Sequence, residues 1–441
     1  MSENIKNQQK ILQKLNIEKL NPMQMQAQHA IHSNQHIVLL SPTGTGKTLA
    51  FLLPIISELN RDIAGVQALI LVPSRELAIQ IEQVIREMGT GFKANAVYGG
   101  RSISKDKVEL KHTPSILIGT PGRVADHLRR QTFNSQTIEF LILDEFDKSL
   151  EVGFENEMID IMSALPSIKK KILTSATFKV KIPNFVGLKD PITINFQADD
   201  SKRLSLKIIL SPEKDKLETL GKLLNKLGNQ PGIVFCNFKD SIQRVSDYLF
   251  DIDIAHECFY GGLEQKDREQ ALIKFRNSSH QLLIATDLAA RGIDVPEIKF
   301  IIHYHLPIKE HEFTHRNGRT ARMHSEGAAY IIQHEDEYLP EFIDKLHPES
   351  IYVESLEQFE DGKDEQWTTL FVSGGRKDKI SKGDIAGLFM KQGKLTKDEI
   401  GLIELKQDCA FVAVKSSKVT ELIHLVSDTK LKKKKIRVRK T

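Results

Sequence analysis

Ten short apolar runs, separated by segments with helical spacing, constrain the fold of this chain more than any other feature of its sequence. The first five are HIVLL (36–40), ALILV (68–72), SILI (115–118), FLIL (140–143) and KILT (171–174). The second five are GIVF (232–235), AHECF (255–259), LLIA (282–285), FIIHY (300–304) and AAYII (328–332). Continuous apolar strands that alternate with helices are typical of parallel sheets with helices on both faces. The pattern predicts two α/β domains, at residues 1–205 and 206–346.

The composition is that of a globular protein. The chain has 441 residues, of which 40% are hydrophobic and 27% are charged, and its apolar runs are too short to span a membrane. Its start, MSENIKNQQKILQKL, lacks the apolar core of a signal peptide, so we expect a cytoplasmic protein without membrane contact. Three cysteines without ligand spacing, Cys236, Cys258 and Cys409, support neither a disulfide framework nor a zinc site.

The net charge of +4 conceals an uneven distribution. Residues 368–441 hold 18 Lys and Arg against 8 Asp and Glu, a surplus of 18 − 8 = +10, so the remainder carries 4 − 10 = −6. Between them lies the acidic stretch HPESIYVESLEQFEDGKDEQ, residues 347–366, which is typical of a linker. We therefore expect a separate basic module at residues 367–441.

A glycine-rich segment, SPTGTGKT, follows the first apolar run, at the strand end where α/β sheets bind ligands. Its glycines let backbone N–H groups surround phosphate oxygens, Lys47 supplies a cation, and Thr48 can ligate Mg²⁺. The general motif has Gly where Ser41 stands, so a Gly-rich turn before Lys-Thr is the alternative. The pattern predicts an ATP-binding loop formed by Thr43, Gly44, Thr45, Gly46, Lys47 and Thr48.

The fourth run ends on carboxylates, in the sequence LILDEFDKSL, Leu141–Leu150. In an enzyme with such a phosphate loop, a neighbouring strand ends on an Asp that holds Mg²⁺, and Asp144 is placed for that role. Glu145 would then orient or deprotonate the attacking water. Alone, Asp-Glu after a strand is more often a solvated loop. Joined to Lys47 and Thr48, it predicts phosphoryl-transfer catalysis.

Eight further motifs follow one another in order: PMQMQ (22–26), PSREL (73–77), GG (99–100), TPGR (120–123), SAT (175–177), QKDR (265–268), ATDLAARGIDVP (285–296) and HRNGRTAR (315–322). Together with the phosphate loop and DEFD, they resemble the motifs of the DEAD-box RNA helicases, over nearly all of residues 15–335. The resemblance implies an α/β fold with two RecA-like parallel-sheet domains in tandem. It also implies ATP and Mg²⁺ as cofactors, and an RNA-stimulated ATPase that acts as an RNA helicase.

The resemblance assigns the remaining nucleotide residues. Gln26 would bond the adenine edge, and Asp294 would lie in the nucleotide half of the cleft, with a helix cap as its alternative role. Arg319 and Arg322 would act as arginine fingers from the second domain, unless they pair with surface carboxylates. Residues expected to couple the ATP state to RNA binding are Asp147, Ser175, Thr177 and His315, of which His315 braces the interface.

A second group of motif residues is expected to contact the RNA backbone. Guanidiniums, hydroxyls and backbone N–H groups hold phosphates without reading bases, so this binding should be independent of sequence. Arg75 and Arg268 could form structural salt bridges instead. The group consists of Arg75, Gly99, Gly100, Thr120, Arg123, Arg268 and Thr286.

Several positions depart from the family pattern. Phe146 stands in DEFD where Ala is usual, which adds the volume of a ring beside the metal site. Gln9 occupies the position of an upstream aromatic residue, which leaves adenine stacking open. Asn317 and Ala321 replace the usual Ile and Gly of HRIGRTGR. Because the charged positions are kept, we expect altered rates rather than lost activity.

The basic tail resembles the RNA-binding domain of the DbpA/YxiN branch, through TLFVSGGRKDKISKGDIAGLF (369–389), IGLIELKQDCAFVAV (400–414) and LKKKKIRVRK (431–440). This implies a small RRM-like α+β domain that recognises a hairpin of large-subunit ribosomal RNA, with phosphate contacts from Arg376, Lys377 and Lys379. Phe371 and Phe411 fit a role in the core better than base stacking.

The sequence thus predicts a monomeric ATP-dependent RNA helicase that locally unwinds or remodels ribosomal RNA in pre-ribosomal particles. Two alternatives stay open. One is a DNA helicase or translocase, and the other is a nucleotide-gated RNA-binding scaffold with little turnover.

Overall fold

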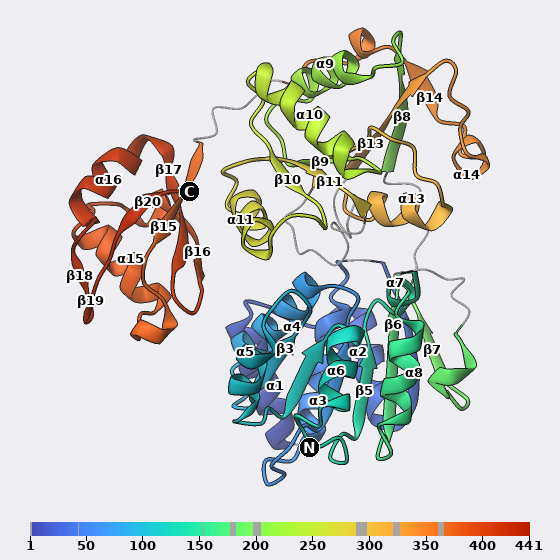
Figure 1. Ribbon diagram of the computed structural model, residues 1–441, viewed down its shortest axis with the longest axis vertical. Coiled ribbons are helices and arrows are strands. Elements are labelled where there is room, and N and C mark those ends of the chain that lie inside the picture. Colours follow the sequence, from blue (N-terminus) through green and yellow to red (C-terminus); the bar gives the residue numbers. More distant parts are fainter. Residues whose placement is uncertain are drawn as a thin grey trace. The chain divides into compact units, whose positions relative to one another are not determined.

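The computed structural model describes residues 2–42, 44–151, 153–176, 182–196, 204–287, 298–320, 327–359 and 366–441 (Figure 1). The chain divides into two compact units, and the break between them falls at residue 202. No helix among the described residues is long and apolar enough to cross a membrane.

The first unit is built on a seven-stranded parallel sheet with the strand order β3-β4-β2-β5-β6-β1-β7. Its strands are β1 (His36–Leu40), β2 (Ala68–Leu71), β3 (Ala94–Val97), β4 (Ile116–Gly119), β5 (Phe140–Leu143), β6 (Lys170–Ser175) and β7 (Ile192–Asn195). Its helices are α1 (Ser2–Lys14), α2 (Pro22–Ser33), α3 (Lys47–Glu58), α4 (Arg75–Met88), α5 (Ile103–Leu110), α6 (Pro121–Arg129), α7 (Phe146–Glu151) and α8 (Glu155–Ser163).

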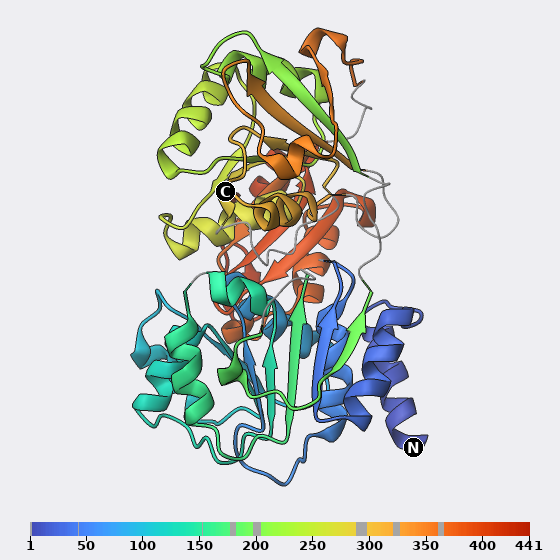
Figure 2. The same cartoon turned by 90° about the vertical axis from the view of Figure 1, so that its right-hand side faces the viewer.

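Helices cover both faces of this sheet, as continuous apolar strands require. Figure 2 shows the N-terminal helices on one side of the strands and later helices on the other. One apolar cluster lies beneath α1 to α4 and includes Phe51 and Ile81, both fully buried. A second cluster lies beneath α6 and α8 and includes Val124 and Ile161. The two cores pack against opposite faces of the sheet. The carboxyl ends of its strands are therefore a rigid platform for the loops that follow them.

The second unit contains another seven-stranded parallel sheet, with the order β10-β11-β9-β12-β13-β8-β14. Its strands are β8 (Leu204–Ser211), β9 (Gly232–Phe235), β10 (Glu257–Phe259), β11 (Leu282–Ala285), β12 (Phe300–His303), β13 (Gly327–His334) and β14 (Glu349–Ile351). The helices around it are α9 (Leu217–Leu227), α10 (Lys239–Asp251), α11 (Gln265–Arg276), α13 (Glu310–Asn317) and α14 (Glu341–Asp344).

The start of the expected acidic linker needs correction. Residues 349–351 form β14, which pairs in parallel with β8. Val353 follows in a short 3-10 helix, Val353–Ser355, and is 4% exposed in the core of the sheet. The acidic side chains misled the prediction, because an edge strand tolerates charge on its solvent side. Residues 347–356 therefore include an edge strand of the second sheet.

The C-terminal module has its own antiparallel sheet, with the order β16-β17-β15-β20, and a short hairpin. Two helices cover one face of the sheet and bury Leu370, Phe389 and Val412 in a separate core. This is the RRM-like α+β arrangement that the sequence predicts. Its elements are β15 (Trp367–Val372), α15 (Lys382–Lys391), β16 (Ile400–Leu405), β17 (Ala410–Lys415), α16 (Val419–Val426), β18 (Lys430–Leu431), β19 (Lys434–Lys435) and β20 (Val438–Lys440).

Candidate active site and nucleic-acid interface

The carboxyl edge of the first sheet gathers the motifs into two halves. The phosphate loop follows β1, Ser175 ends β6, and DEFD follows β5, and these three strands are neighbours. PSREL, GG and TPGR follow β2, β3 and β4, which are also neighbours. Because parallel strands end at the same edge, one edge carries a candidate nucleotide half beside a candidate RNA half.

The phosphate loop has the backbone that its glycines predict. Gly44 and Gly46 adopt φ values of 79° and 84°, in the left-handed region that favours glycine. Gly46 caps α3, which begins at Lys47, and a Cβ atom at Gly46 would overlap the side chain of Gln24. Thr43 lies outside the described residues. The loop therefore leads into the N-terminus of α3, and a helix N-terminus favours a bound anion.

Lys47 is held inside this loop. Its Nζ donates to the carbonyl oxygens of Ser41 and Pro42, at 2.7 Å each. Burial lowers the pKa of Lys47 to about 8, although the carboxylates of Glu145 and Asp144 act in the opposite direction. An anionic ligand at this loop would stabilise the charged form of the ammonium.

The DEFD segment turns sharply after β5. The Thr174 hydroxyl and the Glu145 N–H group both donate to Asp144 Oδ1. Burial, and secondly the charge of Glu145, raises the pKa of Asp144 to about 6. Glu145 has a φ of 48°, a left-handed conformation that is uncommon outside glycine and clusters at functional sites. Its Oε2 lies 2.9 Å from Nζ of Lys148, which is fully buried.

These residues fit Mg²⁺. Thr48 and Asp144 offer oxygen ligands, which this ion prefers. Asp144, Glu145 and Asp147 are all at most 8% exposed. Burial first, and then the charge of Glu145, raise the pKa of Asp144, so a cation here would stabilise its charged form.

The ring of Phe146 packs in the core and does not take up space at the metal site. Its ring is 1% exposed and packs in the apolar cluster of Val124, Leu143 and Met158. The extra volume is thus accommodated in the core beneath α6 and α8. This favours a packing role for Phe146 over a role at the metal.

The start of α2 supplies two residues that sequence reasoning missed. Asn21 and Gln24 form a capping box, and they also reach the phosphate loop. Asn21 Nδ2 donates to Thr45 O at 3.0 Å, and Gln24 Nε2 donates to Gly46 O at 3.2 Å. The Asn-Pro-x-Gln pattern was a signal for the cap, but nothing in it indicates contacts more than 20 residues away. Gln26, the expected adenine reader, is exposed on the same helix.

The candidate RNA half brings four expected residues together. Arg75 begins α4, and its guanidinium lies against Gly100, where a Cβ atom would overlap it. Gly100 has a φ of 83°, so this position requires glycine on both grounds. Thr120 is the N-cap of α6, and its N–H group donates to Val97 O at 3.2 Å. Arg123 follows on the same helix and is 8% exposed at its side chain.

In the second unit, the expected residues lie directly after a strand, or in or just after the helix that follows one. Arg268 on α11 is 7% exposed, and its guanidinium lies 5.2 Å from the ring centre of Phe259. Thr286 follows β11 directly. His315 and Arg319 lie in and just after α13 and are 6% and 3% exposed. Thr177, Asp294 and Arg322 lie outside the described residues.

A buried network fixes the segment that carries Arg319. Arg316 is 1% exposed and makes a bidentate pair with Asp287 at 2.7 and 2.5 Å. It also donates to Asn237 Oδ1 and His305 O, at 2.8 Å each. The unusual Asn317 belongs to the same network, because its Oδ1 atom lies 3.0 Å from His303 Nε2. Asn317, which departs from the family pattern, therefore has a hydrogen-bond partner in the fold.

This network predicts a pH effect on stability. Burial, and secondly the charge of Arg316, lowers the pKa of His303 from 6.5 to about 3. Burial, and secondly Lys216, lowers that of His305 from 6.5 to about 4. Below pH 6.5 the unfolded chain therefore binds more protons than the folded chain, so the second unit should lose stability as the pH falls toward 4.

Thermal melting at a series of pH values measures this dependence. His303→Gln should make it shallower, whereas His424→Gln, at an exposed histidine of the C-terminal module, should leave it unchanged. A wild-type melting temperature that does not fall between pH 6.5 and 4 would contradict the prediction.

The C-terminal module presents a basic surface, which we call the tip patch. It consists of the exposed side chains of Lys377, Lys379, Lys382, Lys432, Lys433 and Lys435. Two ion pairs join its segments: Lys434 to Asp378 at 2.9 Å and Lys432 to Asp384 at 3.0 Å. Among the three expected contacts, Lys377 and Lys379 belong to the patch, and Arg376 is half-buried beside it.

The two phenylalanines of the module do not lie in its core. Phe371 and Phe411 are half-buried cross-strand neighbours, with ring centres 5.7 Å apart. Their strand neighbours Leu370 and Val412 point to the helices, so the rings lie on the other face of the sheet. Arg439 lies 5.0 Å from the ring centre of Phe371. The expectation of a core position is therefore wrong, because the alternation of the strands turns these residues away from the helices.

Family comparisons agree with this geometry. The DEAD/DEAH box helicase family matches residues 21–185, the helicase conserved C-terminal domain matches residues 215–324, and the DbpA RNA binding domain matches residues 369–440. ATP-dependent RNA helicase DbpA of Bacillus subtilis is 31% identical over 92% of this chain and 91% of its own length. DbpA of Escherichia coli is 30% identical over 95% and 94%.

Solved structures show the same fold. S. cerevisiae Dbp5 bound to RNA and ADP BeF3 matches with a TM-score of 0.70 and 26% identity, over 78% of this chain and 93% of that chain. Mss116 bound to ssRNA and UDP-BeF matches with a TM-score of 0.69 and 26% identity, over 80% and 78%. The chain belongs to the DEAD-box ATP-dependent RNA helicases. Within this family it resembles DbpA, with which it shares the C-terminal RNA-binding domain.

Proposed function

We propose that this helicase remodels a hairpin of large-subunit ribosomal RNA during ribosome assembly in the cytoplasm, and that it acts as a monomer. The tip patch carries this proposal. It lies on a module with its own core that contains none of the residues assigned to ATP, so it can hold one RNA element while the two sheets act on another. The likeness to DbpA over more than 90% of the chain supports the same proposal.

The chemical step follows from the first unit's sheet edge. Lys47 and the backbone of the phosphate loop bind the ATP phosphates, and Gln26 and Asp294 bind the rest of the nucleotide. Thr48 and Asp144 would hold Mg²⁺, which neutralises charge on the phosphates. Glu145 orients the attacking water and takes its proton. Arg319 and Arg322 stabilise the charge that develops on the transferred phosphoryl group.

Coupling to RNA is assigned to residues of the nucleotide half and of the second unit. Asp147 lies in the first turn of the short helix α7, after the metal ligand, and Ser175 ends β6 beside the phosphate loop. DEFD follows β5, which is the neighbour of β2 in the RNA half, so Asp147 is placed to report the ATP state. We assign the same role to Thr177 and His315.

Local unwinding is energetically within reach of a protein that holds RNA through several backbone contacts. Opening three stacked steps, at about 1.4 kcal/mol each, costs about 4 kcal/mol. Backbone contacts from Arg75, Gly99, Gly100, Thr120 and Arg123 in the first unit, and from Arg268 and Thr286 in the second, can repay this cost without reading sequence.

The tip patch can be tested by removing its charge in the full chain. Lys377, Lys379 and Lys433 are exposed, so the triple change to Gln should leave the fold intact. We expect preference for the ribosomal hairpin over generic RNA to fall at least about tenfold, and the salt slope of hairpin binding to fall by about one unit per lost phosphate contact. Turnover at saturating generic RNA should stay within about twofold of the wild type.

The matched control is the triple change of Lys391, Lys394 and Lys397 to Gln. These lysines are also exposed, but they lie at and after the other end of α15. This variant should keep the hairpin preference and the salt slope. Equal losses in both variants would show that only the net charge matters, and no loss in either would overturn the role of the patch.

The same ATPase assay separates the alternatives. Stimulation by RNA but not by DNA of the same sequence supports the RNA helicase. Equal stimulation by DNA would support a DNA translocase, and binding of ATP and RNA without turnover would support a scaffold.

A further inference from the structure

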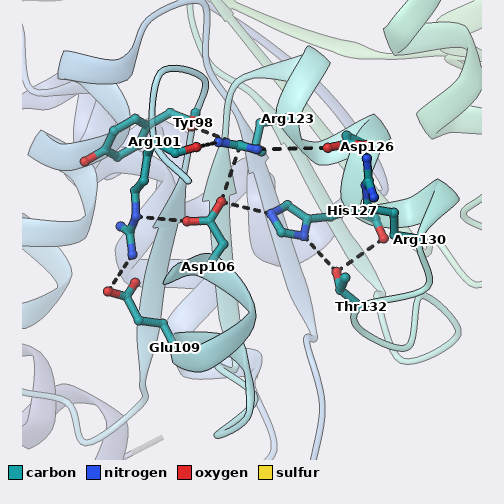
Figure 3. Close-up of polar contacts among 9 residues, drawn as sticks. All are labelled: Tyr98, Arg101, Asp106, Glu109, Arg123, Asp126, His127, Arg130 and Thr132. Carbon is teal, nitrogen blue, oxygen red and sulfur yellow. Dashed lines mark hydrogen bonds and ion pairs between the residues drawn. The ribbon is translucent and has the colours of Figure 1, made fainter. Parts of the chain in front are cut away.

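A buried carboxylate joins three segments of the candidate RNA half. Asp106 on α5 is fully buried, and three basic side chains point toward it in Figure 3. Arg101 Nε lies 2.9 Å from Oδ1, whereas Arg123 Nε and His127 Nε2 lie 3.3 and 3.1 Å from Oδ2. Arg101 belongs to the loop after β3, and Arg123 and His127 belong to α6. The carboxylate thus connects the GG loop to the TPGR helix.

The Arg123 guanidinium forms hydrogen bonds with the backbone of the GG loop. Its Nε also donates to Tyr98 O at 3.0 Å, and its Nη2 donates to Arg101 O (Figure 3). These two carbonyls flank Gly99 and Gly100 directly. Arg123 therefore fixes the backbone on both sides of the two glycines whose N–H groups are expected to face RNA phosphates.

Further carboxylates and a hydroxyl complete the network. Arg101 also pairs with Glu109, with Nη2 and Oε1 2.5 Å apart, so the two guanidiniums face Asp106 and Glu109, and Arg123 also lies 4.0 Å from Asp126. His127 is fully buried, and its Nδ1 lies 2.8 Å from Thr132 Oγ1. Each oxygen of Asp106 faces a guanidinium in an ion pair, so both contacts depend on its negative charge. An amide there would remove that charge and would turn its NH₂ group toward at least one guanidinium, which can only donate.

We infer that Asp106 is a positioning residue for RNA: it acts through Arg123 and Arg101 to hold the GG loop and the TPGR helix at the spacing that binds the RNA backbone. This inference rests on the proposed RNA contacts of these two motifs. Asp106 contacts neither the phosphate loop nor DEFD through any bond in the described part of the chain, so its effect should fall on RNA binding rather than on the chemical step.

Asp106→Asn in the full-length protein tests this inference. ATP turnover is measured against the concentration of a single-stranded RNA. The RNA concentration for half-maximal turnover should rise about tenfold, because a small displacement of a binding loop is costly. Turnover at saturating RNA and the half-saturating ATP concentration should change less than about twofold. Thermal melting shows the temperatures at which both proteins are folded.

Asp126→Asn is the matched control. Its carboxylate lies near the same Arg123, but at 4.0 Å and 23% exposed, so the half-saturating RNA concentration should not change. Arg101→Gln breaks only the link between Asp106 and the GG loop, at a side chain that is 19% exposed. It should weaken RNA binding in the same direction, by less than Asp106→Asn. Because it removes no buried charge, it keeps the test valid if Asp106→Asn does not fold.

Arg75→Ala separates the positioning role of Asp106 from the assignment of these motifs to RNA binding. If Arg75→Ala weakens RNA binding and both Asp106→Asn and Arg101→Gln leave it unchanged, the positioning role is wrong and the RNA half stands. If all three leave RNA binding unchanged, the assignment of these motifs to RNA is itself wrong. A fall in maximal turnover at an unchanged half-saturating RNA concentration would also overturn the inference, since it would place Asp106 in the chemical step.

Discussion

Replacing Glu145 with Gln is expected to lower RNA-stimulated ATP turnover about 10³-fold, within the range for loss of a general base. The amide keeps the volume of the side chain but cannot take a proton from water. Asp144, Thr174 and Lys47 keep their contacts with one another and with the loop, so ATP should still bind. A loss of about 10³ corresponds to about 4 kcal/mol of the activation barrier. Steady-state turnover at saturating RNA, with nucleotide affinity measured separately, checks both statements.

The buried Lys148 complicates this variant. Its Nζ lies 2.9 Å from Glu145 Oε2, so the amide removes a negative charge beside a buried ammonium, and the melting temperature should fall. Glu139→Gln is the control: it precedes β5, at the opposite end of the same strand, and pairs with the exposed Lys169 at 2.6 Å. It should not change turnover. If Glu145→Gln retains turnover within about threefold of the wild type, Glu145 is not the base.

The motifs could be located from the sequence because parallel strands end at one edge. Lys47, Asp144 and Ser175 each follow or end an apolar run, and their strands are neighbours in the sheet. The residue types then indicate the chemistry: an ammonium and glycines for phosphates, a carboxylate for a metal. No knowledge of side-chain geometry was needed for this part of the site.

The supporting residues could not be found in this way. Thr174 contacts Asp144 across 30 positions, and Gln24 contacts Gly46 across 22. Asp106 is an acidic residue in a helix with exposed neighbours, and only the fold shows that it is fully buried between two motifs. Sequence spacing predicts contacts within one helix or strand, whereas these contacts depend on how separate elements pack.

Three of the strands that the sequence did not indicate lie at sheet edges. β7 and β14 are edge strands with mostly exposed residues, and β3 is an edge strand of four residues. Edge strands need no continuous apolar run because only one side is paired and solvent reaches the other. β8 alternates polar and apolar residues over part of its length, as LSLKIILS. The central strands, which are buried on both faces, were indicated by their continuous apolar runs.

Arg319→Ala should lower RNA-stimulated turnover about 10³-fold, at the lower end of the range for an arginine finger. Arg319 follows α13, its N–H group donates to Arg316 O at 3.1 Å, and the buried Arg316 network fixes this backbone. The residue lies in the second unit, so it can stabilise transferred charge only when that unit meets the nucleotide held by the first. ATP affinity, measured without RNA, should therefore change less than about threefold.

Arg319→Lys should recover only part of the loss, because an ammonium lacks the planar fork of the guanidinium. Arg244→Ala removes an exposed arginine that pairs with Asp215, and it should leave turnover unchanged. An Arg319→Ala protein that loses ATP affinity and turnover by the same factor would contradict the finger role, since the side chain would then contribute to binding equally in the ground state and the transition state.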